Sequence, residues 1–275
     1  MNNFLKRTVT ALVYAVVMLA GTILHPVSFA LIFAVILFFT LSEFFSVTKR
    51  SDFFALRITG HVLAQVFFFI CFFVANKFVD PVFLLLPISF IIFVFIAELF
   101  RNSINTFKNS AMSLFGLLYI ALPFSLLNFI VSPGIITDKI FYPWILAGLY
   151  FIIWVYDSAA YITGSLFGKH KIAANISPGK SWEGFIGGTV FAVVMGILNA
   201  VLFQKVSMVN WIIIALLAVT FGTLGDFFES KLKRELGIKD SGSVLPGHGG
   251  LLDRFDSLLF AAPVIFIWLN IMDKF

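Results

Sequence analysis

The sequence predicts an all-α, polytopic integral membrane protein with about nine transmembrane helices. Hydrophobic residues make up 60% of the 275-residue chain and charged residues 12%, whereas a soluble domain carries about 25% charged residues. The mean hydropathy is +1.03. Apolar residues gather in runs close to the length of about 20 that a helical span needs. These runs lie at residues 8–24, 28–47, 57–75, 82–100, 110–131, 143–165, 184–204, 210–228 and 256–272.

The first apolar run follows a short basic segment, Asn2 to Arg7, and in this it resembles a signal peptide. The run is long enough to span, and no convincing small-x-small cleavage site follows it before the next run. We therefore expect an uncleaved first helix. Proline-containing segments at 25–26, 80–81 and 132–134 are typical of tight turns between later spans.

Lysine and arginine are distributed unevenly between the two ends of the predicted spans. With the N-terminus inside, fifteen of them fall in inner segments and four in outer segments. The positive-inside rule therefore favours an N-in, C-out topology, with the polar loops 166–183 and 229–255 in the cytoplasm. Both loops belong to the last four spans. We accordingly divide the chain into residues 1–141, with about five spans, and residues 142–275, with about four.

Four acidic residues fall inside predicted spans, each in the cytoplasmic half: Glu43, Glu98, Asp157 and Asp226. Charges there are costly in lipid and indicate a polar cavity or a cationic partner. A transporter more often places them near the midplane on broken helices in related halves, and no convincing internal repeat is visible. We expect one site, open to the cytoplasm. Basic residues in short loops beside the spans argue against nucleic acid as a partner.

The most polar stretch runs from Ser230 to Asp256 and reads SKLKRELGIKDSGSVLPGHGGLLDRFD. Its lysines and arginines suit phosphates, its carboxylates suit magnesium, and its glycines let backbone amides approach a ligand closely. This mixture indicates a loop that handles a nucleotide. The positive-inside rule alone would explain the basic residues, but it does not explain the PGHGG sequence or the paired aspartates.

Asp253 and Asp256 are three residues apart at the start of the last span. If the segment is helical, they share a face and can offer carboxylates to one metal ion or to a close pair of ions. Asp226, at the cytoplasmic end of the eighth span, is the natural third ligand. The alternative is that Asp253 merely favours a helix N-terminus and pairs with Arg254.

A second polar segment, SPGKSWEG at residues 177–184, precedes the seventh span. It is not a P-loop, because that motif needs a glycine where the chain has Ala174 and because no strand precedes it. Ser177, Lys180 and Ser181 could still form a phosphate cradle before a helix N-terminus. For this segment alone, an interfacial loop anchored by its tryptophan is the favoured interpretation.

Two further residues are candidates for the site. Asp157, with hydroxyl side chains nearby in WVYDSAAYITGS, could be a metal ligand, a ribose contact or the partner of a basic loop residue. His248 is the acid–base candidate, although a histidine flanked by glycines could instead simply donate to a phosphate.

The pattern from Ser230 to Asp256 resembles the signature of phosphatidate cytidylyltransferases (CDP-diacylglycerol synthases). Ser-x-Leu-Lys-Arg is followed after four residues by Lys-Asp, and then by Leu-Pro-x-His-Gly-Gly-x-x-Asp-Arg-x-Asp. Residues upstream, including Asp157, also resemble that family, so the similarity covers roughly residues 154–257. The first five spans match only as generic apolar helices.

One departure from the family pattern lies in the second polar segment. Relatives usually carry Lys and Thr where this chain has Gly179 and Ser181. An essential cation at position 179 is therefore not expected, whereas a hydroxyl at position 181 is retained.

The resemblance implies that CTP and phosphatidic acid give CDP-diacylglycerol and pyrophosphate, with magnesium and room for a second cation. It also implies a homodimer in a bacterial cytoplasmic (inner) membrane, among membrane lipids, with residues 142–275 as the catalytic region. Since the lipid phosphate is already an anion, such an enzyme needs no strong general base. It must hold two polyanions in line and neutralise the leaving pyrophosphate.

The resemblance also implies roles for individual residues. Asp226, Asp253 and Asp256 are assigned to the metal and, with Lys233 and Arg234, form the predicted catalytic set. The residues assigned to substrate binding are Ser177, Lys180, Ser181, Lys239, His248, Gly249, Gly250, Arg254 and Asp157.

Other classes of protein remain as alternatives. A CTP-dependent lipid-alcohol kinase or an ether-lipid cytidylyltransferase would use similar parts, and substrate assays would separate them. A membrane transporter is the non-enzyme alternative, and the one-sided placement of the charges disfavours it.

Overall fold

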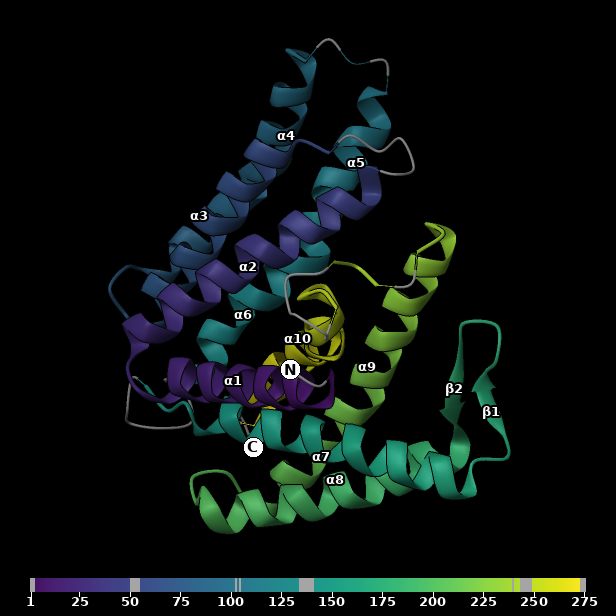
Figure 1. Cartoon of the computed structure of the whole chain (residues 1–275). Helices are drawn as coiled ribbons and strands as arrows, with labels where there is room; N and C mark the ends of the chain where they lie inside the picture. The colour runs from purple at the N-terminus through teal and green to yellow at the C-terminus, as the bar shows by residue number, and fades with distance from the viewer. Residues whose placement is uncertain are drawn as a thin grey trace.

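The computed structural model describes residues 3–49, 55–101, 103, 105–133, 141–238, 240–242 and 249–272, with only the backbone for residues 3–7. Within these ranges the chain is helical apart from one small hairpin, which confirms the predicted all-α membrane fold (Figure 1). Eight helical segments are long and apolar enough to cross a membrane. They are α2 (Pro26–Thr48), α3 (Arg57–Ala75), η2–α4 (Pro81–Leu99), α5–η3–α6 (Thr106–Val131), α7 (Trp144–Phe167), α8 (Trp182–Leu202), α9 (Met208–Glu235) and α10 (Leu252–Met272).

The first predicted span, at residues 8–24, corresponds to α1 (Asn3–Ile23), a helix of 21 residues that is not among these eight segments. Its apolar part, Thr8–Ile23, is shorter than the other eight segments. Prolines mark helix starts as expected: Pro26 opens α2 behind His25, whose Nδ1 accepts a hydrogen bond from the Val27 amide at 3.1 Å. The Val82 amide likewise donates to Asp80 Oδ1 at 2.8 Å where Pro81 opens η2, so the predicted turns at 25–26 and 80–81 are confirmed. The third predicted turn, at 132–134, lies partly outside the described residues.

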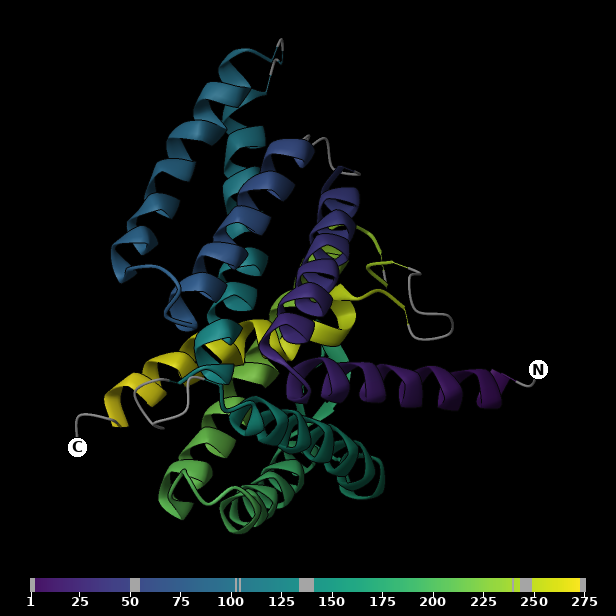
Figure 2. The same ribbon diagram turned by 90° about the vertical axis from the view of Figure 1, so that its left-hand side faces the viewer.

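Two groups of helices lie at opposite ends of the molecule, with α10 between them (Figures 1 and 2). At one end α2 and α3 pack together and α3 packs on α6; at the other, α7 packs along α8, which in turn packs on α9. Helix α10 contacts α9, α6 and α2. Its N-terminal end is therefore the place where both groups meet.

The loop that precedes α8 forms an antiparallel hairpin of β1 (Lys171–Ala173) and β2 (Ser177–Ser181), with Lys171 opposite Ser181. No strand was expected before or within residues 177–184, and the two strands correct this expectation. The short strands pair their backbone groups with each other, which satisfies amides that a turn would leave to water. Helix α8 starts directly after the hairpin, as expected.

The predicted loop 229–255 is shorter than expected at both ends. Helix α9 continues to Glu235, and an ion pair one turn apart, between the Lys233 ammonium and Glu229 at 2.6 Å, supports the added turns. Gly237 ends the helix with φ +65°, and the Ile238 amide donates to the Lys233 carbonyl at 2.9 Å. Because α9 extends to Glu235, the cations at 231, 233 and 234, which were predicted to lie in the loop, lie on a helix. At the other end of the loop, α10 begins at residue 252 instead of 256.

Candidate active site

One face of α9 carries a row of polar side chains. Asp226, Glu229, Ser230 and Lys233 are spaced three or four residues apart, which places them on the same side of the helix. The Ser230 hydroxyl donates to Asp226 Oδ1 at 3.1 Å, and Lys180 of β2 forms an ion pair with Asp226 Oδ2. Lys180 also lies over the ring of Phe227, 5.0 Å from its centroid. The hairpin thereby places the Lys180 ammonium beside the row of polar side chains on α9.

Asp253 and Asp256 lie in the first turns of α10, so the prediction that both sit on one helix is confirmed. Asp253 Oδ1 accepts a hydrogen bond from the Lys233 ammonium at 2.7 Å. Its Oδ2 accepts from the amides of Gly250 at 2.9 Å and Ser241 at 3.2 Å. Asp253 thus holds both the neighbouring helix and the backbone before α10.

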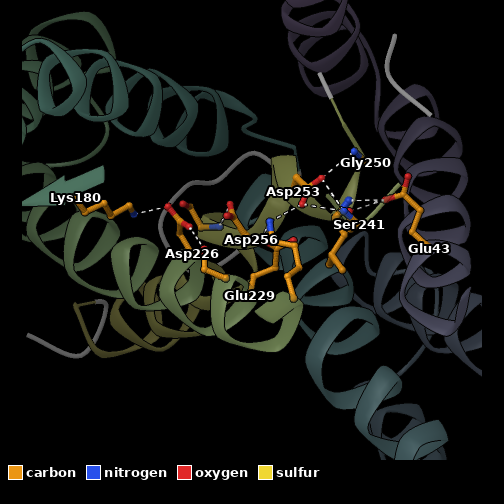
Figure 3. A network of polar contacts seen from close by, with 12 residues as sticks. Glu43, Lys180, Asp226, Glu229, Ser241, Gly250, Asp253 and Asp256 are labelled. Carbon is orange, nitrogen blue, oxygen red and sulfur yellow. Dashed lines mark hydrogen bonds and ion pairs between the residues drawn. The ribbon is translucent and has the colours of Figure 1, made fainter. Parts of the chain in front are cut away.

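Glu229 is a site residue that the sequence analysis missed. Its side chain is 0% exposed, and its Oε2 lies 2.6 Å from the Lys233 ammonium. Lys233 therefore sits between two carboxylates, Glu229 and Asp253. Both acids are labelled in the polar network of Figure 3. The spacing of Glu229 from Asp226 and Lys233 was visible in the sequence, but an acid beside a predicted cytoplasmic loop gave no signal of burial.

Asp157 of α7, Asp226 and Asp256 lie close enough for their charges to act on one another, and Lys180 opposes them. Asp256 Oδ1 accepts a hydrogen bond from the Ser257 amide at 2.6 Å. Three like charges gathered among membrane helices are costly unless cations accompany them. Such an arrangement needs a functional explanation.

A cavity of about 400 Å³ opens beside these acids, between α1, α7 and α10. Asp157, Arg254 and Asp256 line its polar part, and Tyr14 and Trp154 line its apolar part. Helix α1 thus forms one wall of the cavity, a role that its plain apolar sequence did not indicate. The cavity combines charged and apolar walls, as a site for an amphipathic ligand requires.

The hairpin residues predicted to bind substrate have different surroundings. Ser181 is 3% exposed, and its hydroxyl caps α8 by accepting from the Gly184 amide at 3.2 Å. Ser177 pairs with Ala173 in the hairpin. As far as the described residues go, Lys180 is the one of these three that reaches the acids of α9. The favoured interfacial interpretation therefore fits the two serines better than it fits the lysine.

Of the remaining predicted residues, Gly249 and Gly250 lie just before α10, Arg234 lies on α9, and two fall outside the described residues. Gly249 has φ +83°, a conformation that favours glycine, and the amide of Gly250 is engaged by Asp253. Arg234 is exposed on α9. Lys239 and His248 fall among the residues that the structure does not describe, so their predicted roles stay predictions.

The donor set fits a magnesium ion in part. Magnesium prefers oxygen ligands, and a cation between Asp226 and Asp256 would relieve the repulsion to which Asp157 adds. Asp253 fits less well, because Lys233 and two backbone amides occupy its oxygens. Among the described residues, no three His, Cys, Asp or Glu side chains are arranged to hold a metal ion. The predicted three-carboxylate site therefore stays a prediction.

Comparison with known proteins identifies relatives over most of the chain. A phosphatidate cytidylyltransferase of Staphylococcus saprophyticus is 37% identical over 187 residues, which cover 67% of this chain and 68% of that protein. The protein of that name from Staphylococcus aureus is 38% identical over the same length and the same shares. One from Haemophilus influenzae is 45% identical over 120 residues, 42% of each chain. The profile of the Cytidylyltransferase family matches residues 5–272, and the chain therefore belongs to that family.

Proposed function

We propose that this protein is a phosphatidate cytidylyltransferase, which makes CDP-diacylglycerol and pyrophosphate from CTP and phosphatidic acid. The observation that carries the proposal is the cavity lined by Asp157, Arg254 and Asp256, where charged side chains meet apolar walls among membrane helices. The names of the similar bacterial proteins support the same activity.

An apolar groove next to the cavity supports a lipid as one substrate. The groove has a volume of about 750 Å³ and runs between α7 and α8. Trp154 and Ser158 line both the cavity and the groove, so the two spaces adjoin. A phosphate head in the cavity would leave its acyl chains beside a surface that includes Phe151, Ile162, Leu166, Phe191 and Met195.

In the proposed reaction, a phosphate oxygen of the lipid attacks the α-phosphorus of CTP. One P–O bond forms while the bond to the leaving pyrophosphate breaks, and no proton has to be removed from the anionic nucleophile. Lys180 would help to neutralise the phosphates, and Asp226 and Asp256 would hold magnesium. When bound, magnesium would supply charge neutralisation for the leaving pyrophosphate.

The proposed topology is N-in and C-out, with the site facing the cytoplasm of a bacterial inner membrane. The uneven distribution of lysine and arginine supports it. Single cysteines at Asn175 and Ser243 in a Cys71→Ala background should resist an impermeant thiol reagent in intact cells. Labelling of these cysteines from outside the cell would contradict the proposed topology and indicate the opposite orientation. The homodimer implied by the family resemblance can be tested on the purified protein in detergent by light scattering.

The activity is tested with purified protein, radiolabelled CTP and phosphatidic acid in detergent or liposomes. The expected product is a labelled CDP-lipid that requires magnesium. Parallel reactions offer an ether-lipid phosphate and a polyprenol. Turnover of either one without turnover of phosphatidic acid would replace the proposed substrate. Formation of the CDP-lipid is followed with CTP labelled in its cytidine or α-phosphate, and the polyprenol reaction is repeated with CTP labelled in its γ-phosphate, where labelled polyprenol phosphate would indicate a lipid-alcohol kinase.

A further inference from the structure

Glu43 of α2 is a buried carboxylate in the N-terminal half that contacts the active-site segment about 200 positions later. It is 7% exposed. Its Oε2 accepts a hydrogen bond from the Leu252 amide at 2.9 Å and from the Ser241 hydroxyl at 3.4 Å. Figure 3 shows Glu43 at one end of the polar network, with Lys180 at the other. The sequence analysis noted this acid but assigned it no role.

Two glycines make room for the Glu43 carboxylate. A Cβ added at Gly242 would collide with Glu43 Oε1, and one added at Gly250 would lie 2.5 Å from Glu43 Oε2. Only glycine at these two positions lets the backbone close over the carboxylate without a shift. Gly242 precedes residues 243–248, which are not described, and Gly250 follows them. Glu43 therefore contacts the chain on both sides of that segment.

The same backbone is held by Asp253 from the other side. The Ser241 amide donates to Asp253 while the Ser241 hydroxyl donates to Glu43. The Gly250 amide donates to Asp253, and the Leu252 amide, the first of α10, donates to Glu43. First-turn amides have no partner within their own helix, and a carboxylate near them is favoured by the helix dipole. Glu43 thus caps α10 from a different helix.

We propose that Glu43 is a positioning residue, which fixes the start of α10 so that Asp253 and Asp256 face α9 in register. The proposal rests on the proposed function, because it gives the N-terminal helices a part in that site. Burial of a carboxylate is costly unless hydrogen bonds satisfy it. Among the described residues Glu43 Oε1 has no hydrogen-bond partner, so the contacts of Oε2 with the α10 start are the ones that offset the cost of burial and are expected to be maintained. The predicted N-terminal region then acts as a support for the catalytic region.

The test compares Glu43→Ala with Glu43→Gln. Glutamine keeps the size and an oxygen that accepts from the Leu252 amide, so its kcat should stay within about threefold of the parent. Alanine removes the acceptor, and kcat should fall about 10- to 100-fold with a smaller change in KM for CTP. Hydrogen exchange should rise in peptides covering residues 249–260 of the alanine variant and stay unchanged in α7.

Glu98→Ala is the matched control. Glu98 is also a buried acid of the N-terminal half, 1% exposed, and accepts from the Asn109 side chain at 2.8 Å. Its loss should lower thermal stability while kcat and exchange at residues 249–260 stay as in the parent. Equal kcat losses in Glu43→Ala and Glu98→Ala would overturn the positioning role, as would unchanged exchange at the α10 start.

If Glu43→Ala does not fold, Ser241→Ala serves in its place. It removes one donor to Glu43 and should raise exchange at residues 249–260 by a smaller amount. The exchange readout needs no turnover. If the parent protein shows no cytidylyl transfer while exchange rises in the variants, the proposed function is rejected and the cap is supported. Unchanged exchange in Ser241→Ala would reject the cap.

Discussion

Helices α2, α3 and α6 pack mainly through phenylalanine rings, whereas α7 to α10 approach one another through glycines. In the first group the ring centroid of Phe29 of α2 lies 6.4 Å from that of Phe68 of α3, and the ring centroid of Phe33 lies 6.4 Å from that of Phe124 of α6. In the second group a Cβ at Gly196 would lie 2.9 Å from the Trp211 carbonyl oxygen, and one at Gly225 would collide with the Asp256 carbonyl oxygen. Rings fill volume, while glycines fix the distance between backbones.

The acids also find their partners differently in the two regions, apart from Glu43, whose partners lie at the start of α10. Glu98 finds its partners nearby in sequence, in Asn109 and in Arg101 at 3.5 Å. Asp226 pairs with the hairpin, and Asp253 pairs with α9. Apart from Glu43, the first group therefore makes contacts that stabilise its own helices, whereas the second holds charged groups from several elements at fixed separations. Small displacements should therefore matter most in the second group.

Removal of a carboxylate in the second group should have the largest effect. Asp226→Asn and Asp256→Asn keep the size of the side chain but remove the charge proposed to hold magnesium. Turnover should fall about 10²- to 10³-fold, because electrostatic stabilisation is the main catalytic contribution in phosphoryl transfer. The measurement is magnesium-dependent turnover of protein that elutes normally in size exclusion.

Asp240→Asn, in the exposed loop, is the control for these variants and should cost much less. Asp253→Asn sharpens the comparison, because its carboxylate also holds Lys233 and two backbone amides. It should lower thermal stability as well as turnover. Near-parent activity in either Asp226→Asn or Asp256→Asn would contradict the proposal that these acids hold the metal.

An added methyl group between α9 and α10 should have the next largest effect. In Gly225→Ala, the new Cβ would collide with the Asp256 carbonyl oxygen and lie 3.1 Å from Phe260 Cβ. The two helices must separate at the position of Asp226 and Asp256, and a displacement near 1 Å can cost about 10²-fold in rate. The measurement is kcat at saturating CTP and lipid.

Gly179→Ala is the matched control, because a Cβ at Gly179 meets nothing within 4 Å although the residue adjoins Lys180. Its activity should stay within about twofold of the parent. If Gly225→Ala were as active as Gly179→Ala, the distance between α9 and α10 would not determine kcat.

A core substitution in the first group should have the smallest effect on activity. Phe33→Leu removes ring contacts at a fully buried position and should lower the free energy of unfolding by about 1 kcal/mol. Turnover should change by less than about twofold, since the lost contacts lie within the ring-packed group. Thermal unfolding in detergent and kcat are measured together. A large loss of kcat at unchanged Tm would show that the two groups are coupled more tightly than their packing suggests.

The sequence by itself determined the membrane class and the approximate position of each apolar helix, and it indicated that Asp253 and Asp256 would share a face if their segment were helical. These properties depend on apolar run length and on residue spacing, which are local and can be read directly along the chain. The long spaced motif likewise indicated the family before any fold was known.

Only the tertiary structure decided which charges pair and which segments surround the site. Lys233 was predicted to contact phosphate, yet it lies between Glu229 and Asp253. The cavity wall from α1 and the contact of Glu43 with the α10 start had no sequence signal. The physical reason is that pairing depends on how closely separate helices approach, and this distance is set by packing between residues far apart in the sequence.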